Sequence, residues 1–428
     1  MNVITPADAF FLGFDISTDP FPTFRHWLKN FPIYKCEKTT FWYVCSYALV
    51  SEILVHKNVS SDRIAVMHNN LSAEQKKLYA PLLDSLSRWV LYIDPPKHKE
   101  IRAVFNQGFS RRTIYALRES VRDIANGLLD SLDPEKPWDM IQEFAYPLPV
   151  IVISQLLGVP REDRVMLKKW SDKIANFVGM KSSASEVGAA ANQSLIEISA
   201  YIKGVIEAQR RSPRDNLLQK MIELADAGGI FTEADLIANA VTIIFTGHET
   251  TSNMIANSFF ELFNHPEQLE YLLSHIDDED AVNRCVEECL RFDSPIQFIC
   301  RVASGDIHVG NQHIEKGDAI VLVLATANRD SAVFDKPDAF DITRSTSPHM
   351  GLGWGAHSCS GAALARMEVA YALQTILKRF PQLKLDPDSQ LEWHKDLGLR
   401  AMKRLMVVAS PESRCMFTNQ LDKDVAAC

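Results

Sequence analysis

A glycine-rich loop that presents one cysteine runs directly into an Ala/Leu-rich helical pattern, and it constrains this chain more than any other stretch. The loop spans residues 349–366 and contains Cys359. Three alternating glycines precede the cysteine: Gly351, Gly353 and Gly355. Glycine allows backbone turns that side chains forbid. Backbone N–H groups and the dipole of the following helix favour negative charge on the sulfur, so the pattern predicts a stabilised thiolate.

A presented thiolate can be a nucleophile, half of a redox pair or an axial metal ligand. No Cys-x-x-Cys motif surrounds Cys359, which disfavours the redox pair, and no second Cys or His stands at zinc-ligand spacing. A buried free cysteine at a helix start is the plainer alternative. Gly361 follows two residues later, where a small residue would let a broad, flat group lie close.

A second unusual stretch lies inside a long apolar-periodic segment, residues 236–263. About 30 helical residues would extend about 45 Å, enough to cross the molecule. Its middle reads Thr-Gly-His-Glu-Thr-Thr at 246–251. Glycine costs about 1 kcal/mol relative to alanine in a helix, and threonine hydroxyls compete for backbone carbonyls. Poor helix formers inside a strong helix indicate a functional site, with a packing contact at Gly247 as the alternative.

Two cationic side chains share one face of a third segment. Asp-Pro-Pro at 94–96 signals a helix start, and His98 and Arg102 follow four residues apart, on one helix face. Two cationic donors on one face suit a pair of carboxylates, and a solvated basic face is the alternative. Further cations stand nearby, namely Lys97, Lys99, Arg111 and Arg112.

Weaker patterns predict the remaining elements. Residues 22–30 read as a helix, and residues 32–35 and 41–45 as a hairpin at the edge of a small sheet. Residues 57–88 are weakly patterned and polar, which is typical of a mobile loop over a pocket. Residues 391–408 read as a final hairpin.

Together the motifs resemble the cytochrome P450 family. The run 352–366 is similar to that family's haem-binding loop, in which the cysteine is the proximal haem ligand. The resemblance implies that Cys359 binds the iron and that Leu352 and His357 lie at the haem. Leu352 stands where the family has phenylalanine, which keeps the apolar cover but loses the ring.

The other motifs resemble P450 motifs in the expected order. His98 and Arg102 match the family's Pro-Pro-x-His-x-x-x-Arg helix, and Arg301 matches a position that binds a haem propionate. The resemblance implies that Glu249 and Thr250 are the acid–alcohol pair that delivers protons to bound oxygen. It also places Thr246 and Gly247 at the haem, and Thr246 departs from the family's usual alanine or glycine.

A pair of opposite charges three residues apart resembles the family's structural Glu-x-x-Arg motif. The pair is Glu288 and Arg291, and Arg344 matches the third member of that buried ion network. Such a pair is common by chance and stabilises an exposed helix by only about 0.2–0.5 kcal/mol. Breaking a buried network would cost about 3–5 kcal/mol, so the resemblance implies a role in folding and haem-pocket integrity.

The resemblance also implies which residues contact the substrate. They lie on the long helix, on a strand and at the tip of the final hairpin: Phe245, Thr246, Gln297, Phe298, Ile299, Leu397 and Leu399. The set is mostly apolar, which indicates a largely hydrophobic substrate.

The expected fold is mainly α with small β-sheets, a cytochrome P450 fold. We expect one haem domain over residues 1–428, with a long central helix and a loose tail over about 410–428, because no linker or low-complexity run divides the chain. A net charge of −9 argues against nucleic acid as a partner. No basic segment opens the chain like a signal peptide, and no uncharged stretch is long enough to anchor it in a membrane. We therefore expect a cytoplasmic protein.

The resemblance implies a haem-thiolate monooxygenase that carries haem b. It would hydroxylate or epoxidise a hydrophobic small molecule, free or tethered to a carrier protein, as do bacterial members that tailor polyketides, macrolides or acyl chains. Electrons would come from a ferredoxin or flavodoxin fed by NAD(P)H, since the chain has no flavin or NAD motif. That donor would dock on the basic patch around Lys99, with simple solvation of the patch as a rival. Alternatives are a peroxide-driven peroxygenase, a non-catalytic haem or ligand sensor, and a haem-free helical scaffold.

Overall fold

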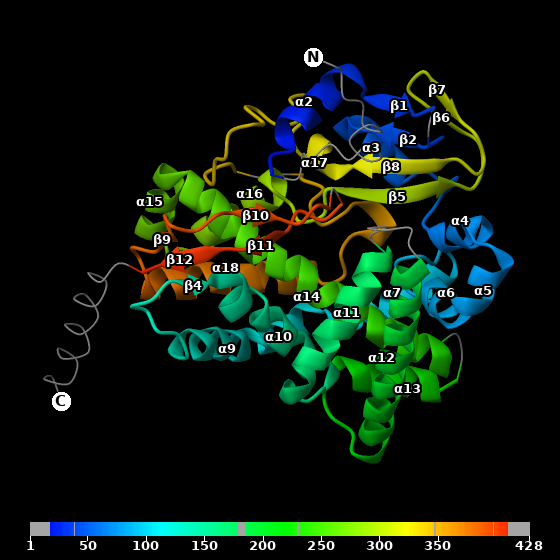
Figure 1. Cartoon of the computed structure of the whole chain (residues 1–428), viewed down its shortest axis with the longest axis horizontal. Helices are drawn as coiled ribbons and strands as arrows, with labels where there is room; N and C mark the ends of the chain where they lie inside the picture. The colour runs from blue at the N-terminus through cyan, green and yellow to red at the C-terminus, as the bar shows by residue number, and fades with distance from the viewer. Residues whose placement is uncertain are drawn as a thin grey trace, which may run out of the picture.

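A computed structural model describes residues 18–37, 39–178, 185–228, 231–345, 348–396 and 398–409. The expected tail at about 410–428 and the hairpin-tip residue Leu397 lie outside this range. Figure 1 shows a sheet-rich part at the top of the view and a helical part beneath it, with the helix α14 between them. Mainly helical content with small sheets confirms the expected fold class.

The central helix α14 (Glu233–Asn264) has 32 residues and confirms the predicted long helix. It begins with a capping box, in which Thr232 Oγ1 accepts the Asp235 N–H and the Asp235 carboxylate accepts the Thr232 N–H. Most of its residues are buried on every side. The helix therefore forms the axis of the largest hydrophobic core.

Other helices pack around this axis. The larger ones are α9 (Arg118–Asp130), α10 (Pro147–Leu157), α11 (Arg164–Val178), α12 (Ser185–Arg211), α13 (Leu217–Asp226), α15 (Pro266–Ser274), α16 (Glu279–Phe292) and α18 (Ala362–Arg379). The N-terminal and shorter ones are α2 (Phe21–Asn30), α3 (Tyr47–Leu54), α4 (Arg63–Asn70), α5 (Ala73–Leu78), α6 (Ala80–Ser87), α7 (Lys97–Gly108), α8 (Arg111–Ala116) and α17 (Leu324–Ala327). A π-helical turn spans Ile141–Ala145, and 3-10 turns span Arg161–Asp163 and Gly355–His357.

The main sheet joins distant parts of the chain. Its order is β1 (Ile33–Lys35), β2 (Trp42–Val44), β8 (Ala319–Val323), β5 (Phe298–Ala303) and β3 (Val59–Ser60). The predicted hairpin is the antiparallel pair β1–β2, and β2 then pairs in parallel with β8. Side chains alternate between the faces of a sheet: Trp42 and Val44 pack in one core cluster, and Tyr43 in another.

Three smaller sheets complete the fold. They are β6 (Ile307–Val309) with β7 (Gln312–Ile314), β10 (Glu392–Trp393) with β11 (Met402–Arg404), and β4 (Trp138–Asp139) with β12 (Met406–Val408) and β9 (Lys384–Leu385). The predicted final hairpin is therefore only β10–β11, because β12 leaves it to join the third of these sheets.

The prediction of a mobile loop over residues 57–88 is wrong, because α4, α5 and α6 occupy this stretch. Local caps support these short helices despite their weak periodicity. The Asp62 carboxylate accepts the Ala65 N–H at the start of α4, and Ser72 and Gln75 form a capping box at the start of α5. Within the described residues, no helix is both long and apolar enough to cross a lipid bilayer.

Candidate active site

The cysteine loop is shaped by glycines that lie in tight positions. Gly353 and Gly355 have φ values of 75° and 71°, a region that favours glycine. A Cβ on Gly351 would lie 2.3 Å from the Leu290 carbonyl oxygen of α16, so this residue must be glycine for the loop to rest on α16. The Cys359 N–H donates to the Leu352 carbonyl at 2.8 Å and closes the loop just before α18.

Cys359 is an exposed residue, although protein atoms surround its sulfur closely enough to affect the pKa of the thiol. Burial raises the pKa of the thiol by more than the Gly361 N–H and the charges of Arg102 and Arg366 lower it. The expected stabilisation of the thiolate by the protein alone is therefore wrong. A coordinating metal ion would deprotonate the thiol outright. Gly361 follows the cysteine by two residues, and a Cβ there would meet no described atom within 4 Å.

Two imidazoles and a guanidinium meet beside the loop. His98 on α7 is buried, and its ring centroid lies 4.0 Å from that of His357. Burial, Arg102 and Arg301 lower the pKa of His98. Burial and the charges of His98, Arg301 and Arg102 lower the pKa of His357 to about 3. Both rings are therefore neutral near pH 7, and the buried His98 Nε2 has no hydrogen-bond partner among the described residues.

Two further arginines extend this group from other elements. Burial and the nearby Arg63 of α4 lower the pKa of Arg301 on β5 to about 10, so both guanidiniums stay charged at neutral pH. Arg63 donates to the Tyr92 hydroxyl at 2.7 Å. No carboxylate forms a salt bridge with Arg63, Arg102 or Arg301 within the described part of the chain. We call His98, His357 and these three arginines the cationic cluster.

Asp94 is the carboxylate whose charge acts on His98 and Arg301. Its oxygens already accept hydrogen bonds from Ser60 Oγ and from the Ser61 N–H. Three guanidinium charges against one carboxylate leave an excess of positive charge beside a thiol. This donor set fits haem, whose iron takes a cysteine ligand and whose two propionates would offset the excess charge. Cys359, His98, Arg102, Arg301 and His357, which the sequence predicted at the haem, are thus brought together.

Sequence reasoning missed a clamp that holds the cysteine loop at both ends. Glu287 of α16 bonds His349 at 3.0 Å and Arg366 at 2.5 Å. His349 Nδ1 accepts the Gly351 N–H, so Nε2 carries the proton and donates to Glu287. Burial opposes the charge on Glu287, but these two partners lower its pKa to about 2. The only signal in the sequence was a second glutamate beside Glu288, which is too common to interpret.

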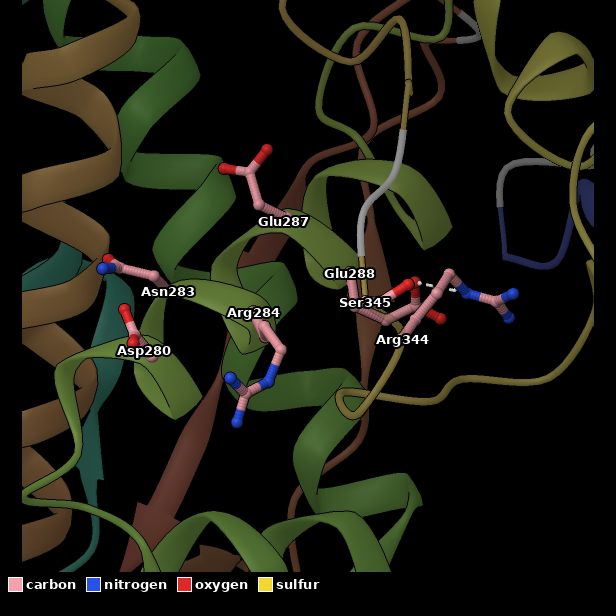
Figure 2. Close-up of a pocket in the computed structure, with 7 residues that line it drawn as sticks. All are labelled: Asp280, Asn283, Arg284, Glu287, Glu288, Arg344 and Ser345. Atoms are coloured by element: carbon pink, nitrogen blue, oxygen red, sulfur yellow. Dashed lines mark hydrogen bonds and ion pairs between the residues drawn. The ribbon is translucent and has the colours of Figure 1, made fainter.

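The predicted Glu288 network is present and its charges are paired. Glu288 binds Arg291 at 2.7 Å and Arg344 at 3.2 Å, and the Glu288 and Arg291 side chains are almost fully buried. Arg291 also donates to three carbonyls, those of Asn328, Pro337 and Ala339. Figure 2 shows Glu287 and Glu288 pointing to different sides of α16, with Arg344 turned toward Glu288. A 470 Å³ pocket lies beside them, and Cys359 is not among its lining residues.

The middle of α14 carries a ladder of threonine hydroxyls. Thr246 Oγ1 donates to the Thr242 carbonyl at 2.8 Å, and Thr250 Oγ1 donates to the Thr246 carbonyl at 3.0 Å. These bonds satisfy the hydroxyls locally while the helix stays continuous. Glu249 is half-buried beside Thr250. Burial raises the pKa of Tyr146 most, and the charges of Asp172 and Glu249 raise it further. The roles of Glu249 and Thr250 in proton delivery stay predictions.

Gly247 serves helix packing. A Cβ there would lie 2.8 Å from the Ile153 side chain of α10, which supports the packing alternative. That Gly247 also lies at the haem stays a prediction. Phe245 is half-buried, and its ring packs against Trp89 with the centroids 5.1 Å apart and a tilt of 44° between the planes. Asn239 of α14 binds the backbone on both sides of Trp89: its side chain accepts the Val90 N–H and donates to the Arg88 carbonyl.

The predicted substrate residues of the strand do not share one surface. Phe298 packs with the core cluster on one face of the sheet and Ile299 with the cluster on the other, because strand side chains alternate. Gln297 precedes β5 and is buried, with Nε2 bonded to the Ser294 carbonyl. Its Oε1 is buried without a hydrogen-bond partner among the described residues, and its contact with substrate stays a prediction. Leu399 pairs with Ile296 in an antiparallel bridge, so the hairpin tip does reach this strand.

The basic patch is smaller than the sequence suggested. Lys97 forms a salt bridge of 3.0 Å with the buried Asp235 at the start of α14, and its charge is therefore offset. Lys99, Arg111 and Arg112 are exposed. Arg118 lies over the ring of Tyr115, which is itself 69% exposed.

Comparison with known proteins places this site in a family. The family model described as cytochrome P450 matches residues 21–406. The biotin biosynthesis cytochrome P450 of Bacillus subtilis is 33% identical over 378 residues, which cover 88% of this chain and 92% of that protein. Cytochrome P450 monooxygenase PikC of Streptomyces venezuelae is 31% identical over 407 residues, 92% of each chain.

A solved structure shows the same architecture. The crystal structure of P450BioI in complex with hexadec-9Z-enoic acid ligated acyl carrier protein matches with a TM-score of 0.84 and 31% identity, over 92% of this chain and 99% of that one. A presented cysteine, the cationic cluster and the buried Glu288 network thus all lie within the residues that match one family, 21–406. The chain belongs to the cytochrome P450 family.

Proposed function

We propose that this P450 is a haem-thiolate monooxygenase that inserts one oxygen atom into a hydrophobic small molecule, by hydroxylation or epoxidation. The observation that carries the proposal is the excess of positive charge in the cationic cluster beside Cys359. Cys359 would ligate the iron of haem b, and Arg102, Arg301 and the neutral imidazoles of His98 and His357 would hold the propionates. The haem supplies the oxygen chemistry when bound.

The chain's own contribution to turnover is proton delivery and positioning. Thr250 has a hydroxyl that now donates to the Thr246 carbonyl at 3.0 Å, and one χ1 rotation would free it to donate elsewhere. Glu249, the next residue on the helix, is half-buried and would resupply the proton. General acid catalysis of this kind contributes about 10²–10⁴-fold to rate.

The partners are inferred from the surface and from relatives. The exposed cations Lys99, Arg111 and Arg112 would dock an acidic ferredoxin or flavodoxin, itself reduced with NAD(P)H, because complementary charge steers association. One similar structure holds an acyl carrier protein, and we extend that route to this chain for a tethered acyl substrate. The six cysteines within the described residues are free thiols, which suits a reducing cytoplasm.

Turnover with a defined electron source tests the proposal. Purified holoenzyme is supplied with NADPH, a ferredoxin reductase and ferredoxin, or with hydrogen peroxide alone, and a panel of fatty acids is analysed for oxygenated products. We expect product with the redox partners. Product with peroxide alone would indicate a peroxygenase, and spectral binding with no product under either condition would indicate a sensor.

Thr250→Ala tests the residue-level assignment. We expect the variant to keep haem and ligand binding but to divert most NADPH electrons to peroxide or water, lowering the product formed per NADPH by about tenfold or more. Thr242→Ala, which removes another hydroxyl of the same ladder, is the matched control and should keep its coupling. Unchanged coupling in Thr250→Ala contradicts the assignment.

A further inference from the structure

A buried junction of charges joins three segments that meet at the predicted substrate-contact region. Asp293 ends α16 and is 1% exposed. The Arg400 side chain lies 3.3 Å from it, with the guanidinium also stacked over the Trp393 ring at 3.3 Å. The junction is assembled by contacts between residues more than 100 positions apart, and no motif pointed to it.

The central helix binds the backbone of both partners. The side-chain nitrogen of Asn257 on α14 donates to the carbonyl of Asp293 and to the carbonyl of Arg400, at 3.2 Å each. Asn257 is almost fully buried. The end of α16 and the segment that leads into β11 are thus fixed to one point of the central helix.

From this point the two segments run side by side. The Arg400 N–H donates to the Pro295 carbonyl at 2.7 Å, and the Gln297 N–H donates to the Gly398 carbonyl at 3.0 Å. Leu399 pairs with Ile296 between these bonds. A Cβ on Gly398 would lie 3.0 Å from the ring of Phe298. The tip of the hairpin is therefore held in one register against the residues that lead into β5.

We propose that Asp293, Arg400 and Asn257 are positioning residues for substrate, which set how the hairpin tip at 398–399 and the strand at 296–299 face the central helix. In this proposal they act through those two segments and not by direct contact with haem or substrate. The inference rests on the proposed function, because it assumes that these two segments contact the substrate. It predicts that the junction controls the binding of long ligands and leaves haem ligation and small ligands unchanged.

We expect the surroundings of Asp293 to tolerate the removal of its charge. Glu261 of α14 is buried beside it, and burial together with the charge of Asp293 raises the pKa of Glu261 to about 8. Without that neighbouring charge Glu261 can ionise and offset Arg400. Asp293→Asn keeps the shape of the side chain, and the Cβ of Gly398→Ala would press on the Phe298 ring at 3.0 Å and touch Asp396 Oδ1 at 3.4 Å.

The experiment measures binding of imidazoles of increasing length to the haem iron of the holoenzyme. The probes are imidazole and 1-dodecylimidazole, followed by the shift of the Soret band. We expect Asp293→Asn and Gly398→Ala each to change the dissociation constant of 1-dodecylimidazole by about tenfold and that of imidazole by less than about twofold. Lys403→Gln, which breaks the exposed pair with Glu392 on the same hairpin, should change neither.

The inference is overturned if the variants change the binding of both probes equally, or leave the binding of 1-dodecylimidazole unchanged. It is also overturned if the wild-type enzyme binds imidazole but not 1-dodecylimidazole. Failure of the proposed function is a different result, because wild-type protein would then lack a Soret response to imidazole altogether. Hydrogen exchange gives a second readout, since the Gln297 and Arg400 amides should exchange faster in both variants than in Lys403→Gln.

Discussion

Two groups of charged side chains flank the cysteine loop, and they differ in how their charges are paired. In the Glu288 network the carboxylate binds two arginines, and Arg291 fills its remaining donors with carbonyls. In the cationic cluster neighbouring members instead add to burial in lowering the pKa values of His98, His357 and Arg301. The carboxylate of Asp94 contributes an opposing charge to His98 and Arg301.

This difference separates folding from binding. A buried charge that is fully paired stabilises one arrangement of the chain, and removing a partner strands the other charge. Like charges held together without partners destabilise the fold, so their retention indicates that a ligand offsets them. The Glu288 network is therefore a structural feature and the cationic cluster a binding site, although both lie beside the same loop.

Breaking the paired group should have the largest effect on stability. We expect Glu288→Gln to lower the free energy of unfolding by about 3–5 kcal/mol, because Arg291 and Arg344 lose their counter-charge. Denaturant unfolding of the purified protein measures this value. Glu279→Gln, at an exposed site in the first turn of the same helix, should change it by less than about 0.5 kcal/mol. Similar values for the two variants would contradict the structural role.

Breaking the unpaired group should weaken cofactor binding instead. We expect Arg301→Gln to lower the affinity of the apoprotein for haem by about 1.5–3 kcal/mol, the size of a hydrogen bond to a charged group, while the apoprotein unfolds at the same or a higher denaturant concentration. Titration of apoprotein with haem and denaturant unfolding give the two values. Arg112→Gln, at an exposed arginine, is the control. An Arg301→Gln apoprotein that is destabilised as much as Glu288→Gln would remove the distinction.

A third buried group sharpens the comparison through pH. Burial and the charge of Asp293 raise the pKa of Glu261 from 4.5 to about 8, against the opposing charges of Arg329 and Arg400. Between these values the folded chain holds a proton that the unfolded chain releases, so stability falls as pH rises toward 8 and then levels. The slope contributed by one proton is at most about 1.4 kcal/mol per pH unit. Glu261→Gln should reduce the change in the free energy of unfolding between pH 5 and pH 8, measured by denaturant unfolding at each pH. A change with pH equal to that of the wild type would contradict this account.

Local motifs predicted the parts of the site that single elements present. His98 and Arg102 share a helix face because they are four residues apart, and Glu288 and Arg291 meet for the same kind of reason. The cysteine loop is equally local, since its glycines and the following helix are contiguous. These residues could be read from the sequence because their geometry depends on one element only.

Long-range contacts could not be predicted in this way. Arg63 joins the cationic cluster only because α4 packs beside β5, and Glu287 reaches His349 and Arg366 across the interface of α16 and α18. The strand residues Phe298 and Ile299 were grouped by their position in the family pattern, but strand alternation sends them to opposite faces. The junction of Asp293 and Arg400 depends on three segments and has no local signal.

The central claim is that Cys359 and the cationic cluster hold a haem with a thiolate ligand. The most direct test is the absorption spectrum of the reduced protein with carbon monoxide, recorded for wild type and Cys359→Ala. We predict a strongly red-shifted Soret band in the wild type, which disappears in Cys359→Ala. A wild-type protein without that band, or a band that survives the loss of Cys359, would contradict the account.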